Sequence, residues 1–296
     1  MTLRAATRGS PLARWQAEHV ASLLGGAVEL VVVETTGDRQ GDVPIWQLGG
    51  QGAFVKEVQA AVLDGRADFA VHSAKDLPST TPPGLVIAAV PQRGDVRDAL
   101  VGGRLDGLPT GARIGTGSVR RRAQLAAYRP DLTFAGLRGN IGTRLEKVGD
   151  YSAIVVAAAA LERLGRADAI TEVLEPGVVL PQVGQGALAV ECRQDDDATL
   201  DALAAIEHAP SRAAVDAERA FLGELGGGCD LPVAALALPE AVGRLTLTGL
   251  LASPDGRVLL RHTMTARDAV DLGRSVAHHL LDDAGGAQLL TGLAVS

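Results

Sequence analysis

Three consecutive arginines follow a segment rich in glycine and hydroxyl residues at positions 114–122, which reads IGTGSVRRR. Glycines allow a backbone to approach a ligand closely, and a helix beginning near Ser118 would present unpaired N–H groups and a partial positive charge. Thr116 and Ser118 add hydroxyl groups, and Arg120 and Arg121 add forked donors that suit carboxylates or phosphates. The pattern predicts an anion site. The alternative is an N-cap followed by solvated arginines, because successive helix residues point about 100° apart.

A second segment, at positions 137–144, reads LRGNIGTR and repeats this arrangement. Asn140 suits the N-cap of a short helix. Arg138 would lie just before that helix and Arg144 one turn inside it, so that the two could clasp one acid group. The alternative for this segment is a surface turn with ordinary arginines.

A polar cluster follows a short apolar run at positions 69–78, which read FAVHSAKDLP. Ligand sites of α/β sheets lie at the carboxyl ends of strands, where this cluster would stand. Asp76 lies beside Lys75, one of only three lysines in a chain that otherwise uses arginine. The positive charges near Asp76 would keep its carboxylate ionised. A single carboxylate in basic surroundings suits a substrate cation or an N–H group. The alternative is a Lys75–Asp76 surface pair that caps a turn.

One cysteine, Cys229, stands on a triple-glycine segment that reads GGGCDLP. An exposed thiol is chemically vulnerable, so a nucleophile or an attachment point is one interpretation. The other is a cysteine packed under the loop as a small hydrophobic residue. Cys192 lies on an expected strand and is predicted to be packed. The glycine-rich segment at 49–56, GGQGAFVK, lacks the motifs that bind nucleoside triphosphates or dinucleotides.

Composition narrows the class of protein that carries these residues. The chain has 296 residues, 47% of them hydrophobic and 21% charged, which is typical of a globular protein with two or three domains. A net charge of −7 and only 3% aromatic residues argue against a nucleic-acid binder. Two cysteines are too few for a disulfide framework or a zinc site. With no apolar run of membrane-spanning length and no apolar leader, we expect a cytoplasmic protein without metal or membrane.

Short β-branched runs alternate with longer helical patterns, which is typical of α/β units with mainly parallel sheets. Strands are expected at residues 28–33, 69–71, 86–90, 154–156 and 188–192, and helices at 12–24, 54–63, 120–128 and 141–148. Towards the C-terminus, expected strands at 245–252 and 257–263 flank the turn signal SPDG, and a helix is expected at 268–281. This last pattern indicates a separate, small α+β domain.

Two segments break the alternation and are predicted to cross between units: the polar, glycine-rich residues 93–111, and residues 174–186 with their prolines and glycines. The sequence also contains an internal echo, that is, a short pattern that occurs twice. A strand, a hydroxyl-bearing loop and a helix start occur at residues 6–10 and again at 115–118. Duplication and the accident of α/β composition explain this echo about equally well.

Taken together, these motifs resemble the hydroxymethylbilane synthase family, also called porphobilinogen deaminase. The resemblance runs from Arg4 to the C-terminal helix. Eight segments occur in the family's order: ATRGSPLA, TTGD, GGQGAFVKE, ADFAVHSAKDLP, GTGSVRRRAQL, LRGNIGTRL, LPQVGQGAL and GGGCDLPV.

The resemblance implies an α/β fold of three domains. The first two would be similar and hinged like a type II periplasmic binding protein, and the third a small α+β domain with an antiparallel sheet. The expected boundaries are residues 1–91 plus 187–204 for the first domain, 97–181 for the second and 209–296 for the third. The second would carry the anion-binding arginines and the third Cys229.

The resemblance also implies a transferase of porphyrin and heme biosynthesis. Such an enzyme joins four porphobilinogen molecules head-to-tail, with loss of ammonia, into the linear tetrapyrrole hydroxymethylbilane. It builds the chain on a dipyrromethane cofactor attached by a thioether, here to Cys229, and a monomer would pass the product to the next tetrapyrrole enzyme. The alternative is a two-domain hinged binding module for a small carboxylate or oxyanion, which would not need a third domain with a loop cysteine.

By the same resemblance, Asp76 is the catalytic residue, whose carboxylate stabilises the cationic azafulvene that forms when ammonia leaves. Arginine and lysine suit these ligands because every pyrrole ring carries an acetate and a propionate group. The residues expected to hold the cofactor are Cys229, Lys75, Ser73, Thr116, Ser118, Arg120, Arg121, Arg144 and Gln185. Those expected to hold the substrate are Arg8, Ser10, Arg138 and Asn140.

Three positions depart from the family's pattern. Gln51 stands where a lysine is usual, and Gly117 stands where a second hydroxyl residue is frequent. Asp230 places a negative charge beside the cysteine that would carry an anionic cofactor.

Overall fold

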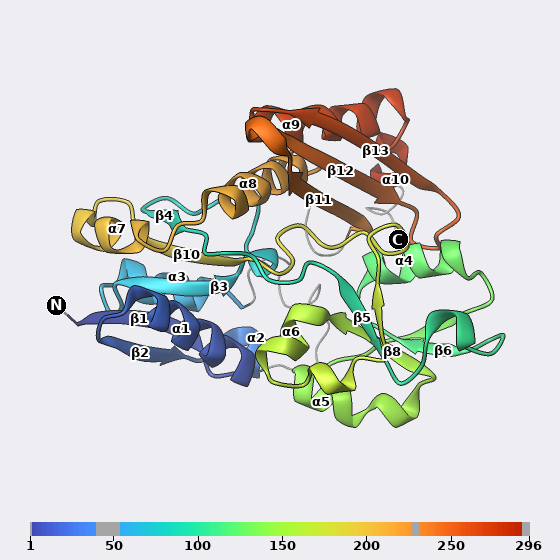
Figure 1. The fold of residues 1–296 in the computed structure, drawn as a ribbon, viewed down its shortest axis with the longest axis horizontal. Coiled ribbons are helices and arrows are strands. Elements are labelled where there is room, and N and C mark those ends of the chain that lie inside the picture. The colour runs from blue at the N-terminus through green and yellow to red at the C-terminus, as the bar shows by residue number, and fades with distance from the viewer. Residues whose placement is uncertain (1, 40–53, 227–230, 292–296) are drawn as a thin grey trace. The chain divides into compact units, whose positions relative to one another are not determined.

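The computed structural model describes residues 2–39, 54–226 and 231–291, and it divides into two compact units. The first unit is Met1–Gly94 with Gly186–Arg212, and the second is Asp95–Gln185 with Ala213–Ser296. The chain passes from one unit to the other inside both segments that the sequence indicated as crossings. Figure 1 shows the elements of each unit.

The first unit is built on a five-stranded sheet in the order β2-β1-β3-β10-β4. Its strands are β1 (Leu3–Arg8), β2 (Val28–Val33), β3 (Phe69–Ser73), β4 (Leu85–Ala89) and β10 (Leu188–Arg193). β1 runs parallel to β2 and β3, and β10 runs antiparallel to β3 and β4. Its helices are α1 (Pro11–Leu24), α2 (Thr36–Arg39), α3 (Lys56–Leu63) and α7 (Asp197–Ala204). α1 and α7 pack on one face of the sheet and α3 packs on the other, which explains the apolar character of the central strands.

The second unit repeats this arrangement in its own sheet, whose order is β7-β6-β8-β5-β9. The strands are β5 (Asp98–Val101), β6 (Arg113–Gly115), β7 (Thr133–Ala135), β8 (Ala153–Ala157) and β9 (Glu172–Leu174). Again three parallel strands are followed by a strand antiparallel to both of its neighbours. α4 (Val119–Tyr128) packs on one face, and α5 (Ile141–Glu146) and α6 (Ala158–Arg163) pack on the other.

The echo in the sequence marks corresponding places in the two sheets. β1 leads through the N-cap Ser10 into α1, and β6 leads through the N-cap Ser118 into α4. Each cap side chain accepts a hydrogen bond from a backbone N–H of the first helical turn, as the local chemistry predicts. The two α/β sheets are therefore similar in strand order, strand direction and helix entry.

The second unit also contains a three-stranded antiparallel sheet, ordered β11-β12-β13. It consists of β11 (Val233–Pro239), β12 (Leu245–Ala252) and β13 (Leu259–Ala266), and it packs with α8 (Ala209–Glu224) and α9 (Ala269–His278) around a shared apolar core. α10 (Ala287–Thr291) and a π-helical turn (His279–Asp283) complete it. Short 3-10 turns occur at Ala74–Asp76, Leu105–Gly107, Val148–Asp150, Ala167–Ala169 and Ala241–Gly243. The predicted fold class, two similar α/β domains and a small antiparallel α+β domain, is confirmed.

The expected elements are present, with small shifts at their ends. The turn at 253–256 closes with a hydrogen bond from Gly256 N–H to Ser253 O at 2.9 Å, between β12 and β13 as predicted. Several elements were not expected, among them the strands β7, β9 and β11 and the helices α2, α6, α7 and α10. Residues 93–111 contain β5, all of whose residues are buried, and α8 occupies 16 residues of the sequence between β10 and β11. β5 escaped prediction because a charged residue begins it and two glycines follow it.

Gly256 holds the β12–β13 turn against α4. Its φ is +74°, and a Cβ there would lie 2.3 Å from Ala123 O and 3.0 Å from Ala127 N. Gly111 has a similar φ of +77° but has nothing within 4 Å of the same position. Both alanine variants suffer backbone strain, and Gly256→Ala adds an overlap with helix backbone. We expect it to lower the free energy of unfolding by about 1–3 kcal/mol more than Gly111→Ala.

Urea unfolding of the two variants measures this difference. Equal losses of stability would show that the contact between the turn and α4 contributes nothing.

Candidate active site

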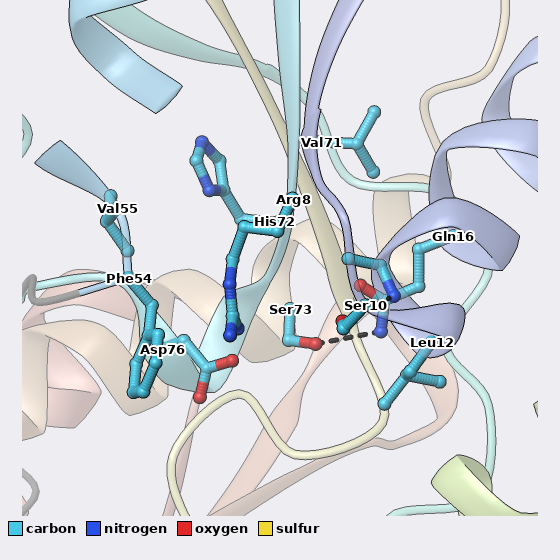
Figure 2. A pocket seen from close by; sticks show the side chains of 11 residues that line it. Arg8, Ser10, Leu12, Gln16, Phe54, Val55, Val71, His72, Ser73 and Asp76 are labelled. Atoms are coloured by element: carbon cyan, nitrogen blue, oxygen red, sulfur yellow. Dashed lines mark hydrogen bonds between the residues drawn. The ribbon is translucent and has the colours of Figure 1, made fainter. Parts of the chain in front are cut away.

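A pocket in the first unit lies where two parallel strands end. Arg8 ends β1 and Ser10 caps α1, while Ser73 ends β3 and is followed by the 3-10 turn that carries Asp76. Side chains from both strand ends line this pocket, as Figure 2 shows. The predicted polar cluster at the carboxyl end of β3 is therefore realised for Ser73 and Asp76, and Arg8 and Ser10 line the same pocket.

The Asp76 carboxylate is the acidic group of this pocket. It is partly buried, and within the described part of the chain its side chain has no hydrogen bond or ion pair. The turn that carries it is held from three directions. Gln16 Nε2 donates to Ser73 Oγ at 2.8 Å, Ala74 N–H donates to Ala187 O at 3.0 Å, and Leu77 N–H donates to Ala74 O at 3.2 Å. The backbone that carries the carboxylate is thus held in place, and the carboxylate oxygens are available to a ligand.

Arg8 brings a positive charge to the same pocket. Its guanidinium carbon lies 4.1 Å from the centre of the Phe54 ring, which is a cation–π contact that orients the side chain. Lys75, in the 3-10 turn beside Asp76, is partly buried but is not among the residues that line the pocket. The pocket therefore combines a carboxylate on a well-held turn with an arginine oriented by Phe54.

A buried polar group that includes the pocket-lining residue His72 was not anticipated. His72 Nε2 lies 3.1 Å from Glu191 Oε2, and Gln59 Nε2 donates to the same oxygen at 2.9 Å. Glu191 is 1% exposed. The available signal was a single glutamate inside the otherwise apolar strand LAVECR. A lone acidic residue in an apolar run does not reveal its partners, which come from β3 and α3.

In the second unit, Arg120 and Arg121 converge on the buried carboxylate of Asp98. Arg120 Nη2 donates to Asp98 Oδ2 at 2.8 Å, and Arg121 donates to Oδ1 from Nε at 3.0 Å and from Nη2 at 2.7 Å. Asp98 is 0%, Arg120 3% and Arg121 7% exposed. The alternative that these two arginines are solvated is therefore wrong, although Ser118 is an N-cap as both interpretations required.

Further contacts fix this cluster, which we call the Asp98 cluster (Asp98, Arg120, Arg121 and Gln185). Gln185 Nε2 donates to Asp98 Oδ1 at 2.9 Å and to Val96 O at 2.8 Å. Arg120 Nη1 donates to Leu180 O at 2.7 Å, and Arg121 Nη1 donates to Val155 O at 3.0 Å. The Arg120 Nε atom is buried and has no hydrogen-bond partner among the described residues.

Burial and the neighbouring charges have opposite effects on the pKa values of Asp98 and Arg120. Burial alone would raise the pKa of Asp98, but Arg120 and Arg121, together with hydrogen bonds from Arg121 and Gln185, outweigh it and hold that pKa well below its usual range. Burial lowers the pKa of Arg120, and the attraction of Asp98 only partly offsets this. Two guanidinium groups face one carboxylate, so the cluster keeps one positive charge.

The segment before α5 supplies further cations. Asn140 is the N-cap, and its Oδ1 accepts from Thr143 N–H at 3.0 Å and from Thr143 Oγ1 at 3.2 Å. Arg144 Nε donates to Gly139 O at 2.8 Å. Arg138 is partly exposed, and no other described residue makes a hydrogen bond or ion pair with its side chain. The N-cap prediction is confirmed, and Arg138 is an available cation.

Positions 116 and 117 differ in their room for a side chain. Thr116 is 7% exposed, and its Oγ1 accepts from Ser118 N–H at 3.2 Å. A Cβ at Gly117 would lie 3.0 Å from Leu137 O, so the missing hydroxyl residue coincides with a tight approach of two backbones. Cys229, Gln51 and Asp230 lie outside the described residues.

Burial also shifts the pKa values of Cys192 and Arg163. Cys192 is packed as predicted, and burial raises the pKa of its thiol to about 11. Arg163, at the end of α6, was not named from the sequence, and burial lowers its pKa to about 10. Such a shift marks a candidate ligand-binding cation, but an arginine in LERLG gives no sequence signal of its burial.

The described ranges contain neither a group of metal-binding side chains nor a helix that could span a membrane. No three histidine, cysteine, aspartate or glutamate side chains are grouped there so that they could hold a metal ion. No described helix has the length and apolar character required to cross a membrane.

Comparison with known proteins matches nearly the whole chain. The porphobilinogen deaminase dipyrromethane cofactor binding domain matches residues 3–201, and the porphobilinogen deaminase C-terminal domain matches residues 213–282. A porphobilinogen deaminase of Brevibacillus brevis is 47% identical over 290 residues, which are 95% of this chain and 94% of the relative. That of Roseiflexus castenholzii is 48% identical over 302 residues, covering 98% and 99%. A periplasmic binding protein of Salmonella typhimurium with high arginine specificity is 14% identical, covers 69% of this chain and 91% of its own, and has a TM-score of 0.38.

Proposed function

This chain belongs to the porphobilinogen deaminase family, and from that premise we propose that Asp76 is its catalytic residue. The chain is a transferase of porphyrin biosynthesis that polymerises porphobilinogen into hydroxymethylbilane with a dipyrromethane cofactor. The alternative of a two-domain binding module is not favoured, since the family match extends over the C-terminal domain as well.

The observation that carries the proposal is the Asp76 carboxylate. It lines the pocket together with Arg8 and Ser10, and no described side chain binds its oxygens. Loss of ammonia leaves the substrate positively charged, and the pyrrole that attacks it also becomes positively charged. A carboxylate held in place before the reaction stabilises both states without having to reorganise. Asp76 also accepts hydrogen bonds from pyrrole N–H groups, which orients the rings.

The Asp98 cluster fits an anionic cofactor. It holds one uncompensated positive charge and a buried Arg120 Nε that has no acceptor among the described residues. The acetate and propionate groups of dipyrromethane supply both the negative charge and the acceptors. When bound, dipyrromethane supplies the pyrrole to which the first substrate unit is joined. Besides Arg120 and Arg121, we propose that it is held by Lys75, Ser73, Thr116, Ser118, Arg144 and Gln185. The thioether to Cys229 is consistent with this family.

We assign the substrate's acid groups to a second set of residues. Arg8 and Ser10 line the pocket with Asp76, and Arg138 has no partner among the described residues. Asn140 already uses its oxygen as an N-cap, so it contributes its amide N–H donors.

Three features of organisation belong to the same proposal. The domains comprise residues 1–91 plus 187–204, 97–181 and 209–296, which keeps each of the three sheets in one domain. The protein acts as a monomer in the cytoplasm. It passes its linear product to the next enzyme of tetrapyrrole synthesis, because a free hydroxymethyl-bearing chain is reactive.

The Arg8→Met variant tests the substrate assignment. A charge-assisted hydrogen bond contributes about 1.5–3 kcal/mol, so kcat/KM for porphobilinogen should fall about 10- to 100-fold. The readout is ammonia released with time. The matched control is Arg66→Met in the same unit, since Arg66 is exposed and pairs with Asp64 at 3.4 Å. If Arg8→Met and Arg66→Met both stay within twofold of wild type, Arg8 does not bind substrate.

A further inference from the structure

We propose that Asp98 is a positioning residue for the cofactor: it holds the two buried arginines of α4 in their binding arrangement before the cofactor arrives. This inference rests on the proposed function, because it assumes that Arg120 and Arg121 bind the cofactor's carboxylates. Asp98 itself does not touch the cofactor.

The geometry shows how much one carboxylate organises. Asp98 receives four hydrogen bonds on its two oxygens, from Arg120, Arg121 and Gln185. It begins β5, whereas the arginines begin α4 and Gln185 closes the segment that leads back to the first unit. Three segments distant in sequence therefore meet on one side chain. Each donor is restrained by a second acceptor, which for Arg120 is Leu180 O and for Arg121 is Val155 O.

The charge count explains why a carboxylate is needed. Two guanidinium groups buried without any counter-charge would be strongly destabilising, because each loses its hydration. Asp98 compensates one of the two charges, which lets the unit fold while it is still empty. The remaining positive charge is left for a ligand carboxylate.

The two arginines differ in the donors they have left. All three nitrogens of Arg121 have an acceptor, on Asp98 or on Val155. Arg120 uses its two Nη atoms, but its buried Nε has no partner among the described residues. Of the five N–H groups of each guanidinium, Arg121 thus uses three and Arg120 uses two, so both keep donors for a ligand and Arg120 keeps more, including its Nε. Asp98 produces this asymmetry because three of its four hydrogen bonds fall on Oδ1.

Stability alone does not account for the cluster. Buried ionic groups can often be replaced by apolar residues of similar volume without loss of stability. β5 is otherwise apolar, reading DALV, and all of its residues are buried. A charged triad at the start of such a strand is therefore explained better by ligand binding than by packing.

The first test measures cofactor loading in the Asp98→Asn variant. Asparagine has nearly the same shape, but it loses the charge and turns an N–H₂ group towards arginine donors. Purified apoprotein is incubated with porphobilinogen, and the fraction that gains the mass of the cofactor is followed by intact-mass measurement of the denatured chain. We expect loading to slow at least tenfold relative to wild type.

A matched control separates positioning from general destabilisation. Leu105→Ala empties a 3%-exposed site in the core of the same unit but outside the Asp98 cluster. We expect it to lower the urea midpoint yet to load within twofold of wild type. If Asp98→Asn also loads within twofold of wild type, Asp98 is a structural counter-ion only. The same conclusion holds if Leu105→Ala and Asp98→Asn are equally stable and slow loading by the same factor.

A second pair of variants gives a test in which charge attraction and positioning predict opposite changes in the loading rate. It remains available if Asp98→Asn alone does not fold. In the Arg121→Met background, Arg120 and Asp98 form a neutral pair. Adding Asp98→Asn leaves Arg120 alone with a positive charge, so attraction of an anionic cofactor predicts faster loading. Positioning predicts slower loading, by at least fivefold, because Arg120 is no longer held. Equal or faster loading in the double variant would overturn the proposal.

The wild-type measurement distinguishes a failure of the proposed function from a failure of this inference alone. A wild-type chain that gains no mass with porphobilinogen would overturn the proposed function and this inference together. A wild-type chain that loads beside Asp98 variants that load equally well would overturn the inference alone.

Discussion

The Asp76→Asn variant is expected to keep its covalent cofactor, or the cofactor's first adducts, and to lose turnover by a factor of about 10²–10³ or more. Asparagine fits the same space in the 3-10 turn. It leaves intact the hydrogen bond that Gln16 donates to Ser73 and the one that Ala74 N–H donates to Ala187 O. It removes the negative charge that offsets the substrate cation and one acceptor for pyrrole N–H groups. The rate of ammonia release at saturating porphobilinogen measures the loss, and intact mass reports what remains attached.

The same substitution at Asp64 provides the control, because Asp64 is exposed in the same unit and pairs only with the exposed Arg66 among the interactions described. Asp64→Asn should turn over like wild type. Turnover near wild type in Asp76→Asn would remove this carboxylate from the reaction and leave the pocket a binding site without its acidic group.

Replacing Cys229 by serine is expected to abolish covalent cofactor completely. The intact mass of denatured wild-type protein should exceed the sequence mass by two acid-bearing pyrrole units, and that of Cys229→Ser should equal the sequence mass. Cys192 cannot take over, since it is 0% exposed and burial raises its thiol pKa to about 11, which leaves almost no reactive thiolate. The Cys192→Ala variant is therefore the control, and it should keep the full excess mass.

Each of the other possible masses has its own meaning. An excess mass that persists in Cys229→Ser would place the attachment elsewhere in the chain. An unmodified wild-type mass that rises after porphobilinogen is added identifies an apoprotein that was produced faster than it was loaded. If the mass still does not rise, the chain does not assemble the cofactor.

Features with local causes were predictable from the sequence. Ser10, Ser118 and Asn140 occur where a polar side chain can cap the next helical turn, and the structure shows each as an N-cap. The carboxyl edge of β3 was recognisable because an apolar run ends abruptly in HSAKD. In these cases the residues that determine the structure lie within a few positions of one another.

Features that depend on distant residues were not predictable. Asp98 meets Arg120 and Gln185 across 22 and 87 positions, and no periodicity or spacing links them. Arg120 and Arg121 consequently left a solvated alternative open, although both are buried. Glu191 and His72 likewise join strands whose pairing only the fold reveals. Long-range electrostatic pairs of this kind require the sheet order, which the sequence does not state.

The position of β10 in the first sheet has a consequence for synthesis on the ribosome. β3 ends at Ser73 and β10 begins at Leu188, yet β10 lies between β3 and β4. Until the nascent chain has emerged past Arg193, β3 has an open edge and β4 has no strand to pair with. An exposed edge invites pairing with other chains, so ribosomes that stall or release within this interval produce an aggregation-prone fragment that chaperones must shield.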